Sequence, residues 1–480
     1  MASKGVDYYF VNTSSHTLSA SATNTNGSYA LSPITVTSTS SQLMTTENCQ
    51  ITWEFPYIDP YGGFSFSTNT TPSKSVTESI NAVTGNTSGP LESMMDTPSL
   101  IGSDFCLSYG FFDAGTGSGT GLTNQDQIYV YLTPSQKNWM GTLAAANPSV
   151  NNAPLASFVL PGAHDAGTYD LTQVNTLCAT TAGVAALAST ILSWIPGATI
   201  VLGLAALQLK GVVVGEAVTQ KDNAVTMLDL GCRYFDFRPG YAPSEIKTIV
   251  PDLYHIHNVV PGKTYQGFLQ DVMTWLIANP SEIVVVSLGT AGFYDHSTMD
   301  PSTATLQTEF LEAQQAAGAT SLQIGSASDL QTSYSSLIAA NKRLFFLNQP
   351  GLNWFPAKKY DSYNDDDYST TDPSKIIKAL KAMTKSGQEN VDYTVLQLQA
   401  TATNQNVVHN VIALADSMSN AYEPLMSTKP HMDSCTYPWL LDNVVANLSH
   451  DNLLVLLNDF VDNALAGSMA SDLTLQRCHP

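Results

Sequence analysis

The sequence predicts an α/β barrel preceded by an all-β region, and three observations support this fold class. Residues 1–135 are rich in Ser, Thr, Asn and Gly and carry short segments in which apolar and polar residues alternate. From residue 136 onward, short apolar runs alternate with helical patterns, as buried parallel strands and their covering helices do. Polar residues suited to catalysis follow the ends of these runs, where a barrel displays its active site.

The first region, residues 1–135, has the pattern of a small β-sandwich. Alternating segments at 8–12, 51–55 and 127–131 are separated by turn clusters, and a helical pattern covers residues 75–82. We expect an accessory domain that carries no catalytic residue. Cys49 with Cys106, and Cys435 with Cys478, either pair in an oxidising compartment or stay reduced, because spacing alone does not decide a connectivity.

The second region, residues 136–480, is predicted to form the barrel. Its strands are the apolar runs at 155–160, 233–237, 253–257, 283–288, 343–347, 394–398 and 453–457. Helical patterns cover 264–278, 305–316, 330–340, 374–384 and 407–418. These repeated strand–helix units favour a barrel, regular or partly open. A doubly wound open sheet is the alternative, although the usual Gly-rich phosphate loop after the first strand is absent.

An apolar insertion at about 171–215 interrupts the barrel. Residues 171–209 contain no charged residue, and Pro196-Gly197 lies within them. Each half is too short for a membrane span, which needs about 20 residues, so we predict a helical hairpin that folds at Pro196-Gly197. Two interpretations stand. The hairpin packs on the barrel as additional core, or Trp194 and Ile195 lie at the rim and contact a lipid surface.

The net charge and the first residues of the chain indicate which partners and which cellular location to expect. The chain has 40 Asp and Glu against 19 Lys and Arg, a formal net charge of −21. Bulk electrostatics therefore excludes nucleic acid as a partner, and contact with anionic lipid has to be local. The acidic run at 364–367 lacks the spacing of a calcium loop and is expected to be solvated. The first residues do not form a secretory signal. We therefore expect either a cytoplasmic protein with peripheral membrane contact or a secreted protein that leaves by a leaderless route or has had its leader removed.

Residues able to do acid–base chemistry gather at the predicted strand ends. Pro161-Gly162 ends the first run, and His164 and Asp165 follow. Later strand ends carry Asp236, Arg238, His255, His257, Asn348, Gln397 and Asp459. Histidines, carboxylates and an arginine on one rim are the inventory of general acid–base phosphoryl transfer. The alternative for each residue alone is structural, for example an Asp236–Arg238 ion pair or a helix cap by Asp459.

A metal site is the competing chemistry. His255 and His257 share one face of their strand and, with Asp165 and Asp236, offer the ligands that zinc or manganese prefers. Arg238 in the same pocket would repel a divalent cation and take over its electrostatic task. We therefore expect no metal ion and no organic cofactor.

Four motifs carry a family resemblance. They are Leu160-Pro161-Gly162-Ala163-His164-Asp165, Gly231-Cys232-Arg233-Tyr234-Phe235-Asp236-Phe237-Arg238, His255, and Asn279-Pro280-Ser281-Glu282. In this order they resemble the X-domain of phosphatidylinositol-specific phospholipase C, from roughly residue 139 to residue 461. The resemblance implies a distorted TIM barrel. It also implies a reaction in which the inositol 2-hydroxyl attacks its own phosphate, so that diacylglycerol leaves and a cyclic inositol phosphate forms.

The resemblance further implies roles for the candidate residues. His164 would be the general base, oriented by Asp459, and His255 would be the general acid, supported by Asp165. Arg238 would stabilise the pentacoordinate phosphorane, and Asp236 would hold the phosphate pocket together. We expect Gln397, Asn348 and His257 to contact the substrate. The calcium-dependent branch has a carboxylate at the position of Arg238 and an Asn at that of Asp165, so the chain resembles the metal-independent, bacterial-type branch.

The residues expected to contact the lipid headgroup differ from the family pattern. Bacterial-type members carry basic residues at positions where this chain has Gly289-Thr290 and Asn348-Gln349. Phosphatidylinositol, its glycosylated anchor form, a lysolipid and another phosphodiester are therefore all open as substrates. We predict a phosphodiesterase that acts on a phospholipid at a membrane surface. The alternatives are a membrane- or glycan-binding, toxin-like protein with a catalytically weak barrel, and a metal-dependent glycerophosphodiesterase-like or sphingomyelinase-like barrel.

Overall fold

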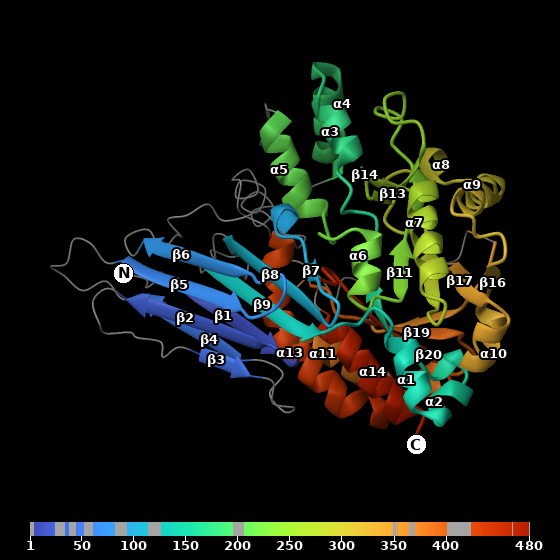
Figure 1. Cartoon of the computed structure of the whole chain (residues 1–480). Helices are drawn as coiled ribbons and strands as arrows, with labels where there is room; N and C mark the ends of the chain where they lie inside the picture. The colour runs from blue at the N-terminus through green and yellow to red at the C-terminus, as the bar shows by residue number, and fades with distance from the viewer. Residues whose placement is uncertain are drawn as a thin grey trace.

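The chain has a β-rich N-terminal part beside a barrel-like part (Figure 1). The computed structural model describes residues 4–24, 34–37, 45–51, 61–81, 94–113, 126–194, 206–348, 352, 354–363, 370–400, 424–462 and 464–479. The statements below concern these residues.

The described N-terminal residues form two β-sheets. The first has the order β4 (Thr45–Ile51), β1 (Lys4–Asn12), β9 (Asp126–Pro134), β8 (Phe105–Asp113) and β7 (Leu100–Ile101). The second has the order β3 (Ile34–Thr37), β2 (Thr17–Asn24), β5 (Tyr61–Thr68) and β6 (Ser75–Asn81). The helix predicted at 75–82 is wrong, because the β-branched residues of this segment favour a strand and β5 pairs with it antiparallel. A separate sandwich domain over 1–135 stays a prediction.

The second part contains an eight-stranded parallel sheet that curls into an open half-barrel. Its order is β16 (Gln323–Gly325), β17 (Lys342–Asn348), β15 (Val284–Leu288), β11 (Tyr234–Phe237), β10 (Val159–Ala163), β20 (Leu453–Asn458), β19 (Tyr393–Gln397) and β18 (Lys359–Asp361). The last strand, β20, pairs with the first, β10, as in a closed barrel. Among the described residues, the edge strands β16 and β18 do not pair with each other. The predicted α/β class is confirmed, with the barrel in its partly open form.

One predicted barrel strand belongs to a different sheet. β13 (Leu253–His257) pairs antiparallel with β12 (Pro239–Tyr241) and β14 (Val260–Thr264) and is not part of the parallel sheet. The prediction of a parallel strand at 253–257 is therefore wrong. Asn258 has a φ of 56°, and this left-handed residue allows the tight turn between β13 and β14. An apolar run shows that a strand is buried but not which neighbour it pairs with.

Helices cover the barrel close to the predicted positions. α7 (Tyr265–Ala278), α9 (Thr303–Ala316), α10 (Tyr334–Ala339) and α11 (Pro373–Ala382) match four predicted ranges. Ser302 and Asp372 cap α9 and α11, because their side chains accept backbone N–H groups of the first turn. The helix predicted at 407–418 lies outside the described residues. Further helices are α1 (Trp139–Ala146), α2 (Pro148–Asn152), α6 (Ala224–Asp229), α8 (His296–Met299), α13 (Pro424–Asn447) and α14 (Leu465–Arg477).

The apolar insertion forms α3 (Thr172–Cys178), α4 (Thr181–Trp194) and α5 (Ala206–Ala217), which project from the barrel in Figure 1. Its buried side chains, including Val174, Leu187 and Leu209, form one cluster with residues next to β13. The described residues thus fit the interpretation of additional core. Pro196-Gly197 and the side chain of Trp194 lie outside the description, so lipid contact there stays a prediction. No single described helix meets the length and hydropathy expected of a membrane span, although α3 and the first part of α4, bent by 118°, do so together.

The structure has free thiols at Cys106, Cys178, Cys232, Cys435 and Cys478, so of the two alternatives left open for the candidate pairs, the reduced one holds. Cys106 is buried in β8. Cys435 is half-buried in α13, and Cys478 is half-buried directly after α14. Burial raises the pKa of the Cys106 thiol to about 12, which keeps it protonated and unreactive at neutral pH.

A buried ion pair fixes the start of β11, the strand that contains Asp236 and leads into Arg238. Arg233 precedes β11, and its Nε and Nη2 donate to Glu282 Oε2 at 3.0 and 2.8 Å. The same guanidinium donates to the carbonyl oxygens of Leu228, Cys232 and Lys137. Both charged side chains are 0% exposed. Because every contact partner is rigid backbone or the paired carboxylate, the start of β11 is held in one register.

Candidate active site

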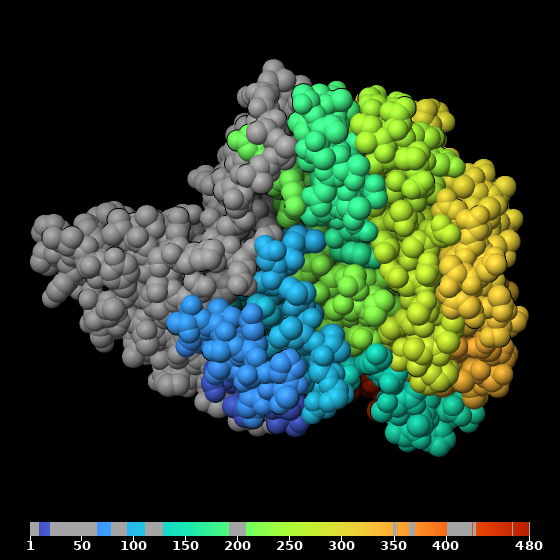
Figure 2. All heavy atoms as spheres, turned by 45° about the horizontal axis from the view of Figure 1, so that its top comes forward, coloured from blue at the N-terminus to red at the C-terminus, as the bar shows by residue number. Residues whose placement is uncertain are grey.

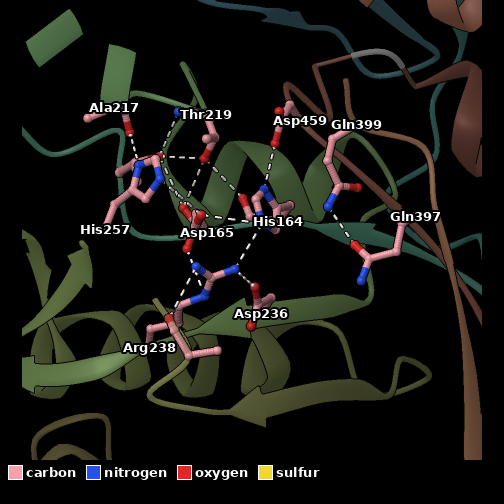
Figure 3. A network of polar contacts seen from close by, with 12 residues as sticks. His164, Asp165, Ala217, Thr219, Asp236, Arg238, His257, Gln397, Gln399 and Asp459 are labelled. Atoms are coloured by element: carbon pink, nitrogen blue, oxygen red, sulfur yellow. Dashed lines mark hydrogen bonds and ion pairs between the residues drawn. The ribbon is translucent and has the colours of Figure 1, made fainter. Parts of the chain in front are cut away.

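A cavity of about 420 Å³ opens at the carboxyl ends of the parallel strands. The predicted residues that line it are His164, Asp165, Asp236, Arg238, His257, Gln397 and Asp459. Side chains in or directly after β10, β11, β13, β19 and β20, which are far apart in the sequence, thus converge on one site (Figure 3). This is the end of a parallel barrel at which active sites form.

His164 follows β10 and is held in one tautomer. Its Nδ1 lies 2.7 Å from Asp459 Oδ1, beyond β20. A carboxylate accepts, so Nδ1 carries the proton and neutral His164 keeps its lone pair on Nε2. The side chains of Thr219 and Gln220 donate to the His164 carbonyl oxygen at 3.1 and 2.9 Å. Burial alone would lower the pKa of His164, but the carboxylates of Asp165 and Asp459 outweigh it and raise the pKa.

Asp165 is the fully buried centre of the site. Its φ of 45° is left-handed, which is uncommon for a residue other than glycine. Its Oδ1 lies 3.0 Å from Arg238 Nε and 3.3 Å from His255 Nε2. Its Oδ2 lies 3.3 Å from His164 Nε2 and 3.7 Å from His257 Nε2. Burial would raise the pKa of this carboxyl, but the guanidinium and the imidazoles hold it well below its usual range.

Arg238 joins the acidic residues to His164. Its Nε faces Asp165, and its Nη2 donates to Asp236 Oδ2 at 3.0 Å. The same Nη2 lies 2.9 Å from His164 Nε2. Asp236 and Arg238 share the cavity face of β11 because side chains alternate along a strand, while Phe237 joins the core cluster behind it. The guanidinium is thus aimed at the space next to the lone pair of His164.

His255 lies behind the cavity and is fully buried. Its Nδ1 accepts the backbone N–H of Arg238 at 3.1 Å, and its Nε2 faces Asp165. The ring packs edge-on against Phe237, with 5.0 Å between the ring centres. A Cβ at Gly167 would lie 2.3 Å from Cβ of His255, so the chain leaves no room on that side. Burial lowers the pKa of His255 against the pull of Asp165, which favours a neutral ring.

His257 has the position that an acid needs. It lines the cavity, and 15% of its side chain is exposed. Its Nδ1 lies 2.8 Å from the carbonyl oxygen of Ala217, the last residue of α5. A carbonyl only accepts, so Nδ1 carries a proton and donates it to this oxygen, which leaves Nε2 available to the cavity. The insertion therefore orients His257 through Ala217.

Comparison with known proteins gives a sequence match over part of the chain. No protein-family model matches the chain. The mouse PI-PLC X domain-containing protein 1 is 26% identical over 152 residues, which is 32% of this chain and 39% of that protein. The chain resembles the phosphatidylinositol-specific phospholipase C X-domain family. The matched segment spans about two fifths of the length of this relative, as its 39% coverage shows.

Solved structures of bacterial phosphatidylinositol-specific phospholipases C also align with the chain. The Listeria monocytogenes enzyme is 14% identical, covering 71% of this chain and 98% of that chain with a TM-score of 0.42. The Staphylococcus aureus enzyme is 16% identical, covering 70% of this chain and 97% of that chain with a TM-score of 0.40.

Within this X-domain-like site, three residues lie close enough to hold a metal ion. The ligand atoms of His164, Asp165 and Asp236 are within 4.8 Å of one another. His255 and His257, which the metal alternative invoked, are not members of this described group. Arg238 contacts all three members, so its guanidinium already supplies the positive charge at their centre. The donor set therefore fits an arginine better than a divalent ion.

The opposite wall of the X-domain-like cavity carries a cation that the sequence did not reveal. Lys359 of β18 lines the cavity, and its Nζ lies 2.6 Å from Asp361 Oδ2. The same oxygen accepts from Gln397 Nε2 at 2.7 Å, which places the predicted Gln397 in the site. Burial opposes the charge on Lys359, but Asp361 outweighs it and raises the pKa. Asn348 is buried, donates to the carbonyl oxygen of residue 352, and is not among the lining residues.

Proposed function

We propose that the chain is a phosphatidylinositol-specific phospholipase C-type phosphodiesterase that needs no metal ion. The observation that carries the proposal is a single cavity bordered by His164 with its partner Asp459, by Arg238, and by His257. Two histidines, each held through Nδ1 so that Nε2 is available, and one guanidinium between carboxylates are what an acid–base phosphoryl transfer requires. The X-domain resemblance supports a phosphoinositide or related phosphodiester lipid as the substrate.

His164 is the general base in this mechanism. Its Nε2 takes the proton from the substrate hydroxyl next to the phosphate, and the hydroxyl oxygen forms a bond to phosphorus. Asp459 holds the ring and stabilises the imidazolium that results. Arg238 balances the negative charge that grows on the phosphoryl oxygens of the pentacoordinate intermediate. Asp236 holds the guanidinium in place through its contact with Nη2.

We assign the general acid to His257 in place of His255. The bond between phosphorus and the diacylglycerol oxygen breaks, and Nε2–H of His257 gives its proton to that oxygen. Diacylglycerol and a cyclic phosphodiester leave, with His164 protonated and His257 neutral, and exchange with water resets both rings. His255 acts as a positioning residue, because it binds Asp165 and the backbone of Arg238 from behind.

The site's surroundings support a lipid substrate presented at a membrane surface. The insertion that orients His257 is uncharged over residues 171–209, and it stands beside the cavity that the substrate must enter. Lys359, Asp361 and Gln397 offer donors and acceptors to the hydroxyl groups of a polyol headgroup. We propose that this wall takes the place of the basic residues expected at 289–290 and 348–349.

Product analysis tests the proposal. Phosphatidylinositol vesicles are incubated with the protein, and diacylglycerol and inositol phosphates are quantified. The His164→Ala variant should lose about 10²–10⁴-fold in rate. The control is His296→Ala, since His296 has a 57% exposed side chain outside the cavity. If His164→Ala forms product at the wild-type rate, the proposal is wrong. If the wild-type protein binds the vesicles but forms no product, a binding protein is favoured.

A further inference from the structure

Two chain segments run from the catalytic histidine to the N-terminal sheet. The first, residues 219–222, begins at Thr219, whose hydroxyl donates to the carbonyl oxygen of His164. The second, residues 459–462, begins at Asp459, the partner of His164. The segments are tied together, because Phe460 N–H donates to the Thr219 carbonyl oxygen at 2.7 Å. The Gln220 side chain makes two further hydrogen bonds between the segments. Its Nε2 donates to the carbonyl oxygen of residue 458, and its Oε1 accepts from the N–H of residue 461.

The far ends of the two segments meet in a buried ion pair. Lys221 Nζ lies 3.2 Å from Asp462 Oδ2, and both side chains are 0% exposed. Residues of the N-terminal part complete the shell around this pair. Lys221 donates to the carbonyl oxygens of Thr97 and Tyr109 at 2.6 and 3.0 Å. Tyr129 of β9 donates its hydroxyl to Asp462 Oδ2 at 2.6 Å.

Serine residues of the same sheet region add further bonds. Ser108 of β8 donates its hydroxyl to the carbonyl oxygen of Asp462. Ser99 donates its N–H and its hydroxyl to the two carboxylate oxygens of Asp222, at 3.0 and 2.6 Å. The described N-terminal residues lie directly against the first half of the barrel part in Figure 2. The N-terminal part therefore supplies polar partners to both segments.

The segment that carries Asp459 needs such support. Phe460 has a φ of 50°, a left-handed conformation that costs free energy for a residue with a bulky side chain. Such a conformation persists only when the surrounding structure over-determines it. Phe460 is buried in the hydrophobic cluster that contains Tyr129 and Tyr131 of β9. Asp459 is therefore held between a strained residue on one side and strand β20 on the other.

We infer that the N-terminal sheet is a positioning element for the catalytic base, acting on the His164–Asp459 pair through Lys221, Asp462 and Tyr129. This gives residues 1–135 a role in the reaction itself and rests on the proposed function for the identity of that reaction. Tyr129 is a positioning residue, since its hydroxyl reaches His164 only through Asp462 and the segment back to Asp459.

The test compares two substitutions in one strand that each remove a single oxygen atom. Tyr129→Phe deletes the donor to Asp462. Tyr131→Phe is the matched control, because Tyr131 is also fully buried and its hydroxyl makes no hydrogen bond among the described residues. The readouts are the pKa of the His164 imidazole by NMR, kcat and KM on phosphatidylinositol vesicles, and the urea midpoint of unfolding. The His164 resonance is assigned by its absence in His164→Gln.

Tyr129→Phe should lower kcat about tenfold with KM unchanged, as small misplacements far from the chemistry do. It should also lower the pKa of His164, because a displaced Asp459 stabilises the imidazolium less. Tyr131→Phe should change neither. Ser108→Ala is a second variant with the same expected direction. Equal behaviour of Tyr129→Phe and Tyr131→Phe in kcat and in the pKa of His164 would overturn the inference.

The NMR readout separates this inference from the proposed function. A wild-type protein without lipid turnover refutes the proposed function, while the pKa of His164 in the two variants still decides the inference. A loss of urea stability in Tyr129→Phe with an unchanged pKa of His164 would show that the sheet only stabilises the fold.

Discussion

The choice of His257 over His255 as the general acid makes a sharp prediction. His257→Leu removes the proton donor from the cavity wall, whereas His255→Leu removes a ring that contacts Asp165 and Arg238 from behind. General acid catalysis contributes about 10²–10⁴ in rate. At 1.36 kcal/mol for each factor of ten, the loss in His257→Leu is about 2.7–5.4 kcal/mol of transition-state stabilisation.

The leaving group distinguishes loss of the acid from general damage. Diacylglycerol leaves as an alkoxide that needs a proton, whereas p-nitrophenolate from an inositol aryl phosphodiester does not. The His257→Leu variant should therefore lose about 10²–10⁴-fold on the lipid and less than about tenfold on the aryl substrate. The assay is kcat/KM on both substrates at one pH, with both variants checked by urea unfolding.

His255→Leu should behave differently from His257→Leu. It removes a fully buried ring packed on Phe237, so the free energy of unfolding should fall and both substrates should lose rate by the same factor. Equal losses on both substrates in His257→Leu would refute the assignment. A loss confined to the lipid in His255→Leu would return the acid role to His255.

Three further predictions follow from the site and its support. Burial opposes protonation of His164, but the neighbouring carboxylates raise its pKa above 6.5. Because the base acts in its neutral form, kcat/KM should rise with pH through a midpoint above 6.5. Asp459→Asn should move that midpoint to lower pH. Arg238→Lys keeps the charge but loses the fork that reaches Asp236 and His164, so kcat should fall about 10²–10³-fold. Glu282→Ala leaves Arg233 buried and unpaired, so urea unfolding should show a loss of about 3–5 kcal/mol.

The sequence predicted the strand ends well because each candidate site residue lies in or directly after a short strand-forming run. His164, Asp165, Asp236, Arg238 and Asp459 all meet in one cavity, as their places after predicted strands required. The Arg238-centred geometry could be anticipated from alternation within β11. Five such residues therefore locate the site before any coordinates are considered.

The errors concern segments whose partners a local apolar pattern does not specify. The apolar run at 253–257 showed a strand but not its antiparallel hairpin, and that hairpin decides which histidine faces the cavity. Lys359 escaped notice because β18 has only three residues, too few for a periodic pattern. Tyr129 and Lys221 are more than ninety residues apart and meet only through tertiary packing, so no local signal joined them to the site.

The most direct test of the central claim is ³¹P NMR of phosphatidylinositol vesicles incubated with the protein in EDTA and ¹⁸O-labelled water. The mechanism predicts a cyclic inositol phosphodiester without ¹⁸O as the first product, with one diacylglycerol released for each cyclic phosphate. A first product that is linear and carries ¹⁸O, or turnover that stops in EDTA and returns with a divalent cation, would contradict it.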